Sequence, residues 1–412
     1  MMVRFVVASW LLAAFAVQAV EAPVAPGLLA TALARPLLDQ DPGVTAARAG
    51  LEVARQEAEI LTQSPYEWTA KALTQRRTVT AGGRYGEWNV GIERGLRLPA
   101  KGAADRRLGE ATVDEARARY GESVHDAARE LMASWLGWLA AEQAHALAQA
   151  GLIFTQENLA AVAKRVRAGD ASRLDANLAS AELAEQRRLE NEAKTQASIA
   201  WARLSTRFPG LVKERVTLPL PFALDQNDGF WRQRILSESD ELRIVEAQVA
   251  KAEAQAEHER ASRIPDPTLG VYTASEVGGR ERISGITISI PLPGGLRAAR
   301  SAKAAAAQEV AANARELKRR QLETAIAGEL AAARGSYDSM QIAAEGAQGM
   351  QENAKLTQRA YSLGEGDLQT LLLARRQANA AAASALQAQL VALKAWYGLL
   401  VDAHLVWDLE RD

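Results

Sequence analysis

The chain contains the same strand-to-helix passage twice, and this duplication constrains its fold more than any other feature. One copy begins at Gly91 and reads GIERGLRLPAKGAADR, and the other begins at Gly285 and reads GITISIPLPGGLRAAR. The two starts are 194 residues apart, and two later glycines, Gly169 and Gly364, are 195 residues apart. The chain is therefore expected to consist of two copies of one structural unit.

Each passage changes from a strand pattern to a helix pattern. In the second copy, Ile286, Ile288 and Ile290 alternate with small or polar residues, as in a strand with one apolar face. Prolines and glycines then end the strand, and the alanine-rich, proline-free segment that follows is typical of a helix. The sequence therefore predicts strands that lead directly into long helices.

The predicted helices have two lengths. Proline-free segments at residues 101–168 and 296–361 predict helices about 100 Å long, at 1.5 Å per residue. Helices about half as long are expected at residues 28–62, with a break or kink near its prolines, and at 172–206, 230–262 and 367–403. Two short helices end to end match one long helix, so two helical hairpins of equal height are predicted.

A β-hairpin is expected before each long helix, at residues 64–98 and 267–292. Its strands are close to the roughly 9–11 residues that a tilted strand uses to cross a bilayer. A soluble hairpin buried on one face fits any single strand equally well, but four such strands in an exported chain favour a membrane location. Five aromatic residues are expected near strand ends, at the membrane interface: Tyr66, Trp68, Tyr85, Trp88 and Tyr272.

The first 22 residues have the pattern of a signal peptide. Arg4 precedes a mostly apolar run from Phe5 to Val17, and small residues follow before Ala19 and Ala22, where cleavage is expected. The alternative is a buried helix. No later stretch approaches the roughly 18–20 uninterrupted apolar residues of a membrane helix. The mature protein is therefore expected to be exported.

The expected domains are a first repeat at residues 23–207, a breaker-rich equatorial linker at 208–229 and a second repeat at 230–412. Four strands cannot close a membrane barrel, because the smallest known have eight. Open sheet edges are not tolerated in lipid. If the hairpins enter a membrane, several copies of the chain must build one barrel together.

Composition and motifs exclude several functions. The formal net charge of −1 argues against nucleic-acid binding, and the chain has no cysteine to form disulfides or thiolate metal sites. No phosphate loop, dinucleotide fingerprint or nucleophile elbow occurs in a fitting context. The histidines are far apart and are expected to form no metal site: His125, His145, His258 and His404. We therefore expect no enzyme, no cofactor and no bound metal.

Over essentially the whole mature chain, the sequence resembles the TolC family of outer-membrane channel proteins of tripartite efflux and type I secretion systems. The resemblance rests on the passages LRLPAKG and IPLPGGL, the tips RVRAGDASRLD and RAYSLGEGDL, and the alternation of long and half-length helices. It implies a mainly α fold with a small β part. Duplicated helical hairpins would form a trimeric α-barrel, and four strands per protomer would contribute to a 12-stranded transmembrane β-barrel.

The resemblance also implies a function. The protein would be a passive exit duct in the outer membrane with a large periplasmic portion, a homotrimer that works with a periplasmic adaptor and an inner-membrane pump of RND or ABC type. The segment VGIERGLRLPAKGAADRR is most similar to the heavy-metal efflux branch. Two alternatives stay open: the outer-membrane component of a type I protein secretion system, and a periplasmic coiled-coil scaffold or adaptor.

The resemblance assigns individual residues only at the two helical tips. Asp175, six residues after Gly169, takes the place of a ring-forming aperture aspartate. Tyr361, three residues before Gly364, takes the place of a gating tyrosine. Asp175 is equally well explained as an ordinary acid in the first turn of a helix, where the helix dipole favours it.

The sequence departs from the family pattern at two positions of the tips. Gly366 stands where an arginine would hold the closed state, and Thr370 where a second aspartate would stand. A gate closed by the same salt bridges is therefore not expected. Charged residues flank both tips as candidates for contacts with an adaptor or between protomers, or as a solvated cluster: Arg165, Arg167, Asp170, Arg173, Glu365 and Asp367.

Overall fold

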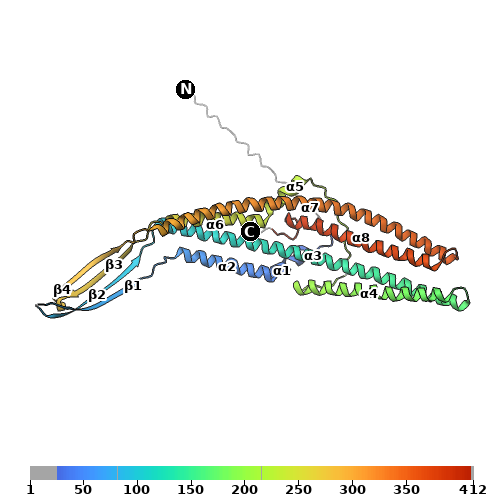
Figure 1. Cartoon of the computed structure of the whole chain (residues 1–412), viewed down its shortest axis with the longest axis horizontal. Coiled ribbons are helices and arrows are strands. Elements are labelled where there is room, and N and C mark those ends of the chain that lie inside the picture. Colours follow the sequence, from blue (N-terminus) through green and yellow to red (C-terminus); the bar gives the residue numbers. More distant parts are fainter. Residues whose placement is uncertain (1–25, 81, 215, 410–412) are drawn as a thin grey trace, which may run out of the picture.

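The computed structural model describes residues 26–80, 82–214 and 216–409. The predicted signal peptide at residues 1–22 lies outside the described residues. The molecule is elongated, with a β-sheet at one end and helices along the rest of its length (Figure 1). The turns that join the long helices to the half-length helices lie at the end opposite the sheet, and these turns are called the helical tips below.

The two halves of the chain repeat one order of elements. The first half contains α1 (Thr31–Asp39), α2 (Pro42–Thr62), β1 (Thr69–Thr78), β2 (Arg84–Gly95), α3 (Pro99–Ala168) and α4 (Arg173–Arg207). The second half contains α5 (Asp228–Glu238), α6 (Asp240–Ala261), β3 (Thr268–Glu276), the short 3₁₀ turn η1 (Val277–Gly279), β4 (Glu281–Ser289), α7 (Gly295–Leu363) and α8 (Leu368–Asp402).

Two helical segments are interrupted by capping residues. The expected break in the first segment falls at Asp41, whose Oδ1 accepts a hydrogen bond from the Gly43 nitrogen at 2.7 Å and begins α2. The prediction of one helix at residues 230–262 is wrong. Ser239 has extended backbone and caps α6 by accepting a hydrogen bond from the Leu242 nitrogen at 3.2 Å, so the segment is divided into α5 and α6.

The long helices pack sideways through small residues. α3 contacts α2, α4, α6 and α8, and α7 contacts α6 and α8. At Gly109 on α3, an added Cβ would lie 3.0 Å from Ala58 on α2, so a larger side chain would push the two helices apart. None of the helices in the described ranges combines the length and apolar character needed to cross a membrane.

The largest buried core lies at mid-length, in a region called the waist below. Here α1, α5, the end of α8 and the linker before α5 lie against α3 and α7 (Figure 1). Aromatic side chains dominate this core, with ring centroids 5.1 Å apart for Trp135 and Trp138 and 4.7 Å apart for Trp396 and Tyr397. The waist therefore joins the two repeats through apolar burial.

The strands form one antiparallel sheet in the order β1-β2-β3-β4, which leaves β1 and β4 as its edges. The two hairpins join through β2 and β3, where Gly91 is opposite Tyr272. Tyr272 is also opposite Gly285 on β4, and a Cβ at Gly285 would lie 2.7 Å from its ring. Gly285 thus leaves space for the tyrosine ring, and Gly91 allows the β2 backbone to lie close to the Val271 carbonyl and the Tyr272 Cβ.

Candidate functional site

Glycine ends both long helices at the helical tips. Gly169 after α3 and Gly364 after α7 have left-handed backbone, with φ of 84° and 78°. This conformation lets the Asp170 and Glu365 nitrogens donate to carbonyls of the last helical turn, at 2.8 and 3.0 Å. The glycine pattern in the sequence therefore marks two equivalent turns with the same local geometry.

The two helices that follow the tips, α4 and α8, each begin with a side-chain hydroxyl hydrogen-bonded to a carboxylate. The hydroxyl comes first on α4, and the carboxylate comes first on α8. On α4, Asp175 accepts hydrogen bonds from the Ser172 nitrogen at 3.0 Å and the Ser172 hydroxyl at 2.9 Å. On α8, Asp367 is the cap, and it accepts hydrogen bonds from the nitrogen and the hydroxyl of Thr370, both at 2.8 Å. Each tip therefore keeps one carboxylate at its first helical turn.

The hydrogen bonds at the start of α8 also affect the charge of Asp367. The backbone and hydroxyl donors of Thr370 hold the pKa of the Asp367 carboxyl below its ordinary value, because they stabilise the ionised form. Asp367 is exposed, so this charge faces solvent in the protomer. The acid expected at Thr370 is thus present three residues earlier.

Arg165 on α3 and Tyr361 on α7 connect the two tips. The Arg165 guanidinium lies 5.2 Å from the Tyr361 ring centroid, within cation–π range, and donates to the Asp170 carbonyl at 3.4 Å. These residues line a pocket of about 610 Å³. Nearby, the Arg375 guanidinium lies 4.0 Å from the ring centroid of Phe154, a contact with no local signature in the sequence.

The other predicted tip residues are not brought together. Arg167, Arg173 and Glu365 are exposed, and within the described part of the chain none of them forms an ion pair. Arg167 donates instead to the Ala163 carbonyl of its own helix at 3.3 Å. These side chains are therefore available to groups outside the protomer.

The sheet has one apolar face and one polar face. Cross-strand partners point to the same side of a sheet, so the pairing register defines both faces. Ion pairs lie on the polar face, including Lys71 with Glu93 at 2.7 Å and Arg77 with Glu276 at 3.1 Å. The apolar face carries Ala70, Ala72, Thr74, Trp88, Val90, Ile92, Leu269, Val271, Thr273, Ser284, Ile286 and Ile288, and near the strand ends it also carries Arg76, Arg94, Ser275 and Arg282.

The predicted positions of the sheet aromatics need correction. Trp88 and Tyr272 lie in the middle of β2 and β3, not near strand ends. The register places Tyr272 and Tyr85 on the polar face, whereas Trp88 is on the apolar face and 44% exposed. Trp68 lies just before β1 and is 65% exposed. Tyr66 lies at the base of the sheet, where its hydroxyl donates to Asp266.

Buried ion pairs connect the base of the sheet to the start of α3. Asp266, before β3, accepts a hydrogen bond from Tyr66 at 2.8 Å, and the Lys101 ammonium of α3 lies 3.0 Å from its other oxygen. Arg97 bridges Asp266 and Asp105. Burial raises the pKa of Asp266, but Lys101 and Tyr66 outweigh it and hold the pKa below its ordinary value. Sequence reasoning missed this junction because Asp266 is separated from Arg97 by 169 residues and from Tyr66 by 200 residues.

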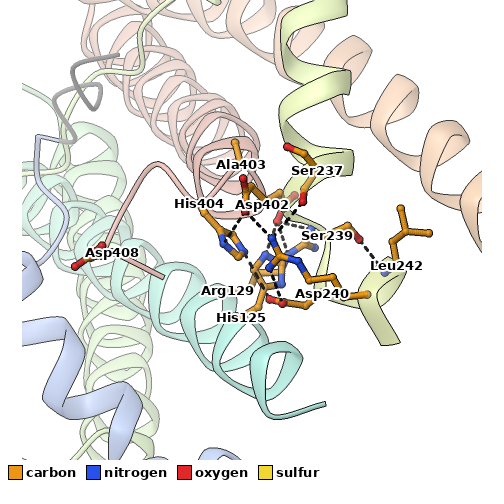
Figure 2. Close-up of polar contacts among 12 residues, drawn as sticks. His125, Arg129, Ser237, Ser239, Asp240, Leu242, Asp402, Ala403, His404 and Asp408 are labelled. Carbon is orange, nitrogen blue, oxygen red and sulfur yellow. Dashed lines mark hydrogen bonds and ion pairs between the residues drawn. The ribbon is translucent and has the colours of Figure 1, made fainter. Parts of the chain in front are cut away.

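A second polar cluster lies at the waist (Figure 2). Asp402 at the end of α8 accepts a hydrogen bond from Arg129 at 2.7 Å and lies 3.2 Å from His125 Nε2. His404 follows α8 with left-handed backbone at φ of 52°, and its Nε2 lies 3.6 Å from Asp240. Burial lowers the pKa of His404, which disfavours the charged form of its ring.

Beside this cluster is a cavity of about 280 Å³. Burial raises the pKa of Glu122, which lines it, to about 7, and His125 opposes this shift. Although the four histidines are far apart in the sequence, His125 has two acids within one helical turn of it. Glu122, His125 and Asp126 share one helical turn, with ligand atoms all within 4.8 Å of one another.

The sequence profile of the family described as outer membrane efflux protein matches residues 33–207 and 231–400. The chain belongs to the outer membrane efflux protein family. The two matched ranges cover both repeats and leave out the linker between α4 and α5. A comparison with curated protein sequences finds no match.

Solved channels of this kind share the fold of this outer membrane efflux protein. CusC is 17% identical with a TM-score of 0.72, covering 90% of this chain and 91% of that chain. The open state of the MtrE outer membrane channel of Neisseria gonorrhoeae is 22% identical with a TM-score of 0.72, covering 93% and 90%. VceC of Vibrio cholerae is 15% identical with a TM-score of 0.71, covering 90% and 95%. The predicted TolC-like fold is confirmed.

Family membership gives this outer membrane efflux protein a general role as an outer-membrane efflux channel. A channel of this kind requires no catalytic centre. The assignment to a heavy-metal branch stays a prediction, because likeness to CusC at 17% identity shows the fold alone.

Proposed function

We propose that this protein is the passive exit duct of a tripartite efflux system. In this proposal three protomers form one trimer in the outer membrane, and a periplasmic adaptor and an inner-membrane pump supply substrate and energy. The observation that carries the proposal is the sheet, whose apolar face is exposed and whose edge strands β1 and β4 are unpaired in the protomer.

The sheet supports closure by several copies. In lipid, the free backbone groups of β1 and β4 require partners, and β1 of one protomer pairing with β4 of the next supplies them. The apolar face would then contact lipid. The polar face, with the pair of Lys71 and Glu93, would line a water-filled lumen.

The exposed apolar side chains of α7 also support a trimer. Val310, Leu317, Ile342 and Leu356 are 58–71% exposed. Their spacings of 7, 25 and 14 residues are close to whole helical turns. Each spacing is slightly short of whole turns, so these side chains follow a stripe that winds by about 80° around α7 between Val310 and Leu356. Such a stripe suits packing against a neighbouring protomer.

The trimer is tested by cell fractionation and gel mobility of the full-length protein. We expect a trimer in the outer-membrane fraction that becomes monomeric on heating. Recovery of a soluble periplasmic monomer would contradict the proposal.

Fluorescence tests the orientation of the sheet. Brominated lipid should quench the exposed Trp68 and Trp88, and the variant Trp68→Phe/Trp88→Phe should lose this quenching. The matched control is Trp138→Phe, which removes a buried tryptophan of the waist and should leave the quenching intact. Equal quenching in all variants would place the sheet outside the bilayer.

We further propose that the carboxylates at the helical tips, Asp175 and Asp367, surround the periplasmic aperture. Three copies of each would create a negative field that favours cations. Asp175→Asn should therefore reduce cation block of the reconstituted channel, while Asp338→Asn, an exposed acid in the middle of α7, should leave it unchanged. Identical currents in wild type and Asp175→Asn would remove Asp175 from the aperture.

A further inference from the structure

The waist cavity contains more acidic groups than basic ones. Six of its lining residues are acids, and Arg129 is the only lysine or arginine among them. Asp402 is paired with Arg129, Asp240 with Arg243 and Glu241 with Lys318. In contrast, Glu122 and Asp126 form no ion pair with lysine or arginine within the described ranges. Two carboxylates of the cavity therefore lack a cationic partner.

A histidine lies between these two acids. Glu122, His125 and Asp126 occupy positions i, i+3 and i+4 of α3, so their side chains share one face, with ligand atoms within 4.8 Å of one another. Asp402 lies 3.2 Å from His125 Nε2, so Nδ1 is the ring nitrogen that does not face this acid. A carboxylate behind a histidine is a common arrangement in metal sites, where it orients the ring.

Two buried polar groups lack hydrogen-bond partners, one that lines the cavity and one that lies next to His125. Glu122 Oε2 is shielded from solvent and has no hydrogen-bond partner. The side chain of His404 is only 3% exposed, and neither ring nitrogen has a hydrogen-bond partner. Figure 2 shows the His404 ring directed toward Asp240 and His125, and its centroid lies 5.6 Å from that of His125. Buried polar groups without partners are rare unless a water or an ion satisfies them.

We propose that the waist cavity binds one divalent transition-metal cation through Glu122, His125 and Asp126. One imidazole with two carboxylates suits Zn²⁺ and neighbouring metals better than Mg²⁺ or Ca²⁺, which prefer oxygen ligands alone. Three protein ligands leave a fourth position for water. The ion would neutralise the excess acids where α3, α6, α7 and α8 meet.

Zn²⁺ is the probe for the first test. Untagged full-length protein in detergent is stripped with EDTA, dialysed against Zn²⁺ at neutral pH, and its bound metal counted by mass spectrometry. We expect one Zn²⁺ per protomer. His125→Ala and Glu122→Gln/Asp126→Asn should each weaken binding by about tenfold or more. The matched control is His145→Ala on the same helix, which removes a histidine paired with Glu190 and should leave binding unchanged.

Co²⁺ tests the nitrogen ligand directly. The visible absorption of bound Co²⁺ should change in His125→Ala and persist in His145→Ala. Circular dichroism identifies any variant that has lost its helices. If His125→Ala unfolds, the double variant Glu122→Gln/Asp126→Asn still tests the site, because it nearly preserves the shape of both side chains. Failure of the wild type to retain Zn²⁺, or unchanged binding in the folded double variant, would overturn the proposal.

Discussion

Arg376 on α8 donates a hydrogen bond from Nε to Glu182 on α4, across a distance of 2.7 Å. Glu182 is buried, and Gln186 one turn later also donates to it at 3.1 Å. Apart from this pair, α4 and α8 have few contacts with each other. This ion pair therefore links the two repeats between the waist and the helical tips.

Arg376→Met is expected to lower the free energy of unfolding by about 1–3 kcal/mol, because it leaves a buried carboxylate without its main partner. Glu182→Gln/Arg376→Met should recover most of this loss, since the double variant buries no charge. Thermal or denaturant unfolding followed by circular dichroism measures both. A double variant as unstable as Arg376→Met would mean that packing of the arginine, and not its charge, stabilises the link.

Much of the fold could be predicted because its signals are local. Proline-free segments and terminal glycines define α3 and α7, and alternating residues define the strands. The division at Ser239 was not predictable, because serine caps helices but is also tolerated within them. Contacts such as that of Glu182 with Arg376 join residues 194 apart and leave no local pattern.

The candidate sites were predicted less completely for the same reason. The sequence places Asp175 and Asp367 at the tips, but only the structure shows that hydroxyl and carboxylate exchange positions between the repeats. The prediction that Tyr272 lies at a strand end was wrong, because alternation shows which residues share a face and not where a strand begins. The waist cluster depends on His404, which lies far from His125 in the chain.

Ser172→Ala should destabilise the first turn of α4 by about 1 kcal/mol, because it removes the hydroxyl that accepts a hydrogen bond from the Asp175 nitrogen. Hydrogen exchange of the amides at residues 173–176 should then be faster than in the wild type. The turn before α8 serves as an internal control, since Asp367 caps it independently. Faster exchange at both tips would indicate that the tips open together.

Gly91→Ala should prevent correct joining of the two hairpins. A Cβ at Gly91 would lie 2.8 Å from the Val271 carbonyl and 3.0 Å from the Tyr272 Cβ, and the neighbouring backbone cannot move away without breaking the ladder. We expect a large loss of assembled protein in the membrane. Gly86→Ala on the same strand is the matched control, because its Cβ meets no atom within 4 Å.

Glu122→Gln is expected to stabilise the protein at about pH 8 in the presence of EDTA and to have little effect at about pH 5. Burial raises the pKa of Glu122 from 4.5 to about 7. Between these values the folded protein holds a proton that the unfolded chain releases. The contribution of Glu122 to the free energy of unfolding is therefore fully present below pH 4.5 and is lost as the pH rises through 7.

The expected gain at the higher pH is on the order of 1–2 kcal/mol, because glutamine replaces a partly buried, ionised carboxylate by a neutral group of the same shape. The contribution of His404 to stability has the opposite pH dependence, because burial lowers its pKa: it is present above about pH 6.5 and is lost as the pH falls through the lowered pKa. His404 is present in both wild type and variant, so the difference in unfolding midpoint reports the removal of the Glu122 carboxylate together with its interaction with His125. An equal difference at both pH values would contradict a raised pKa, because only a group that ionises between them makes the benefit of the substitution depend on pH.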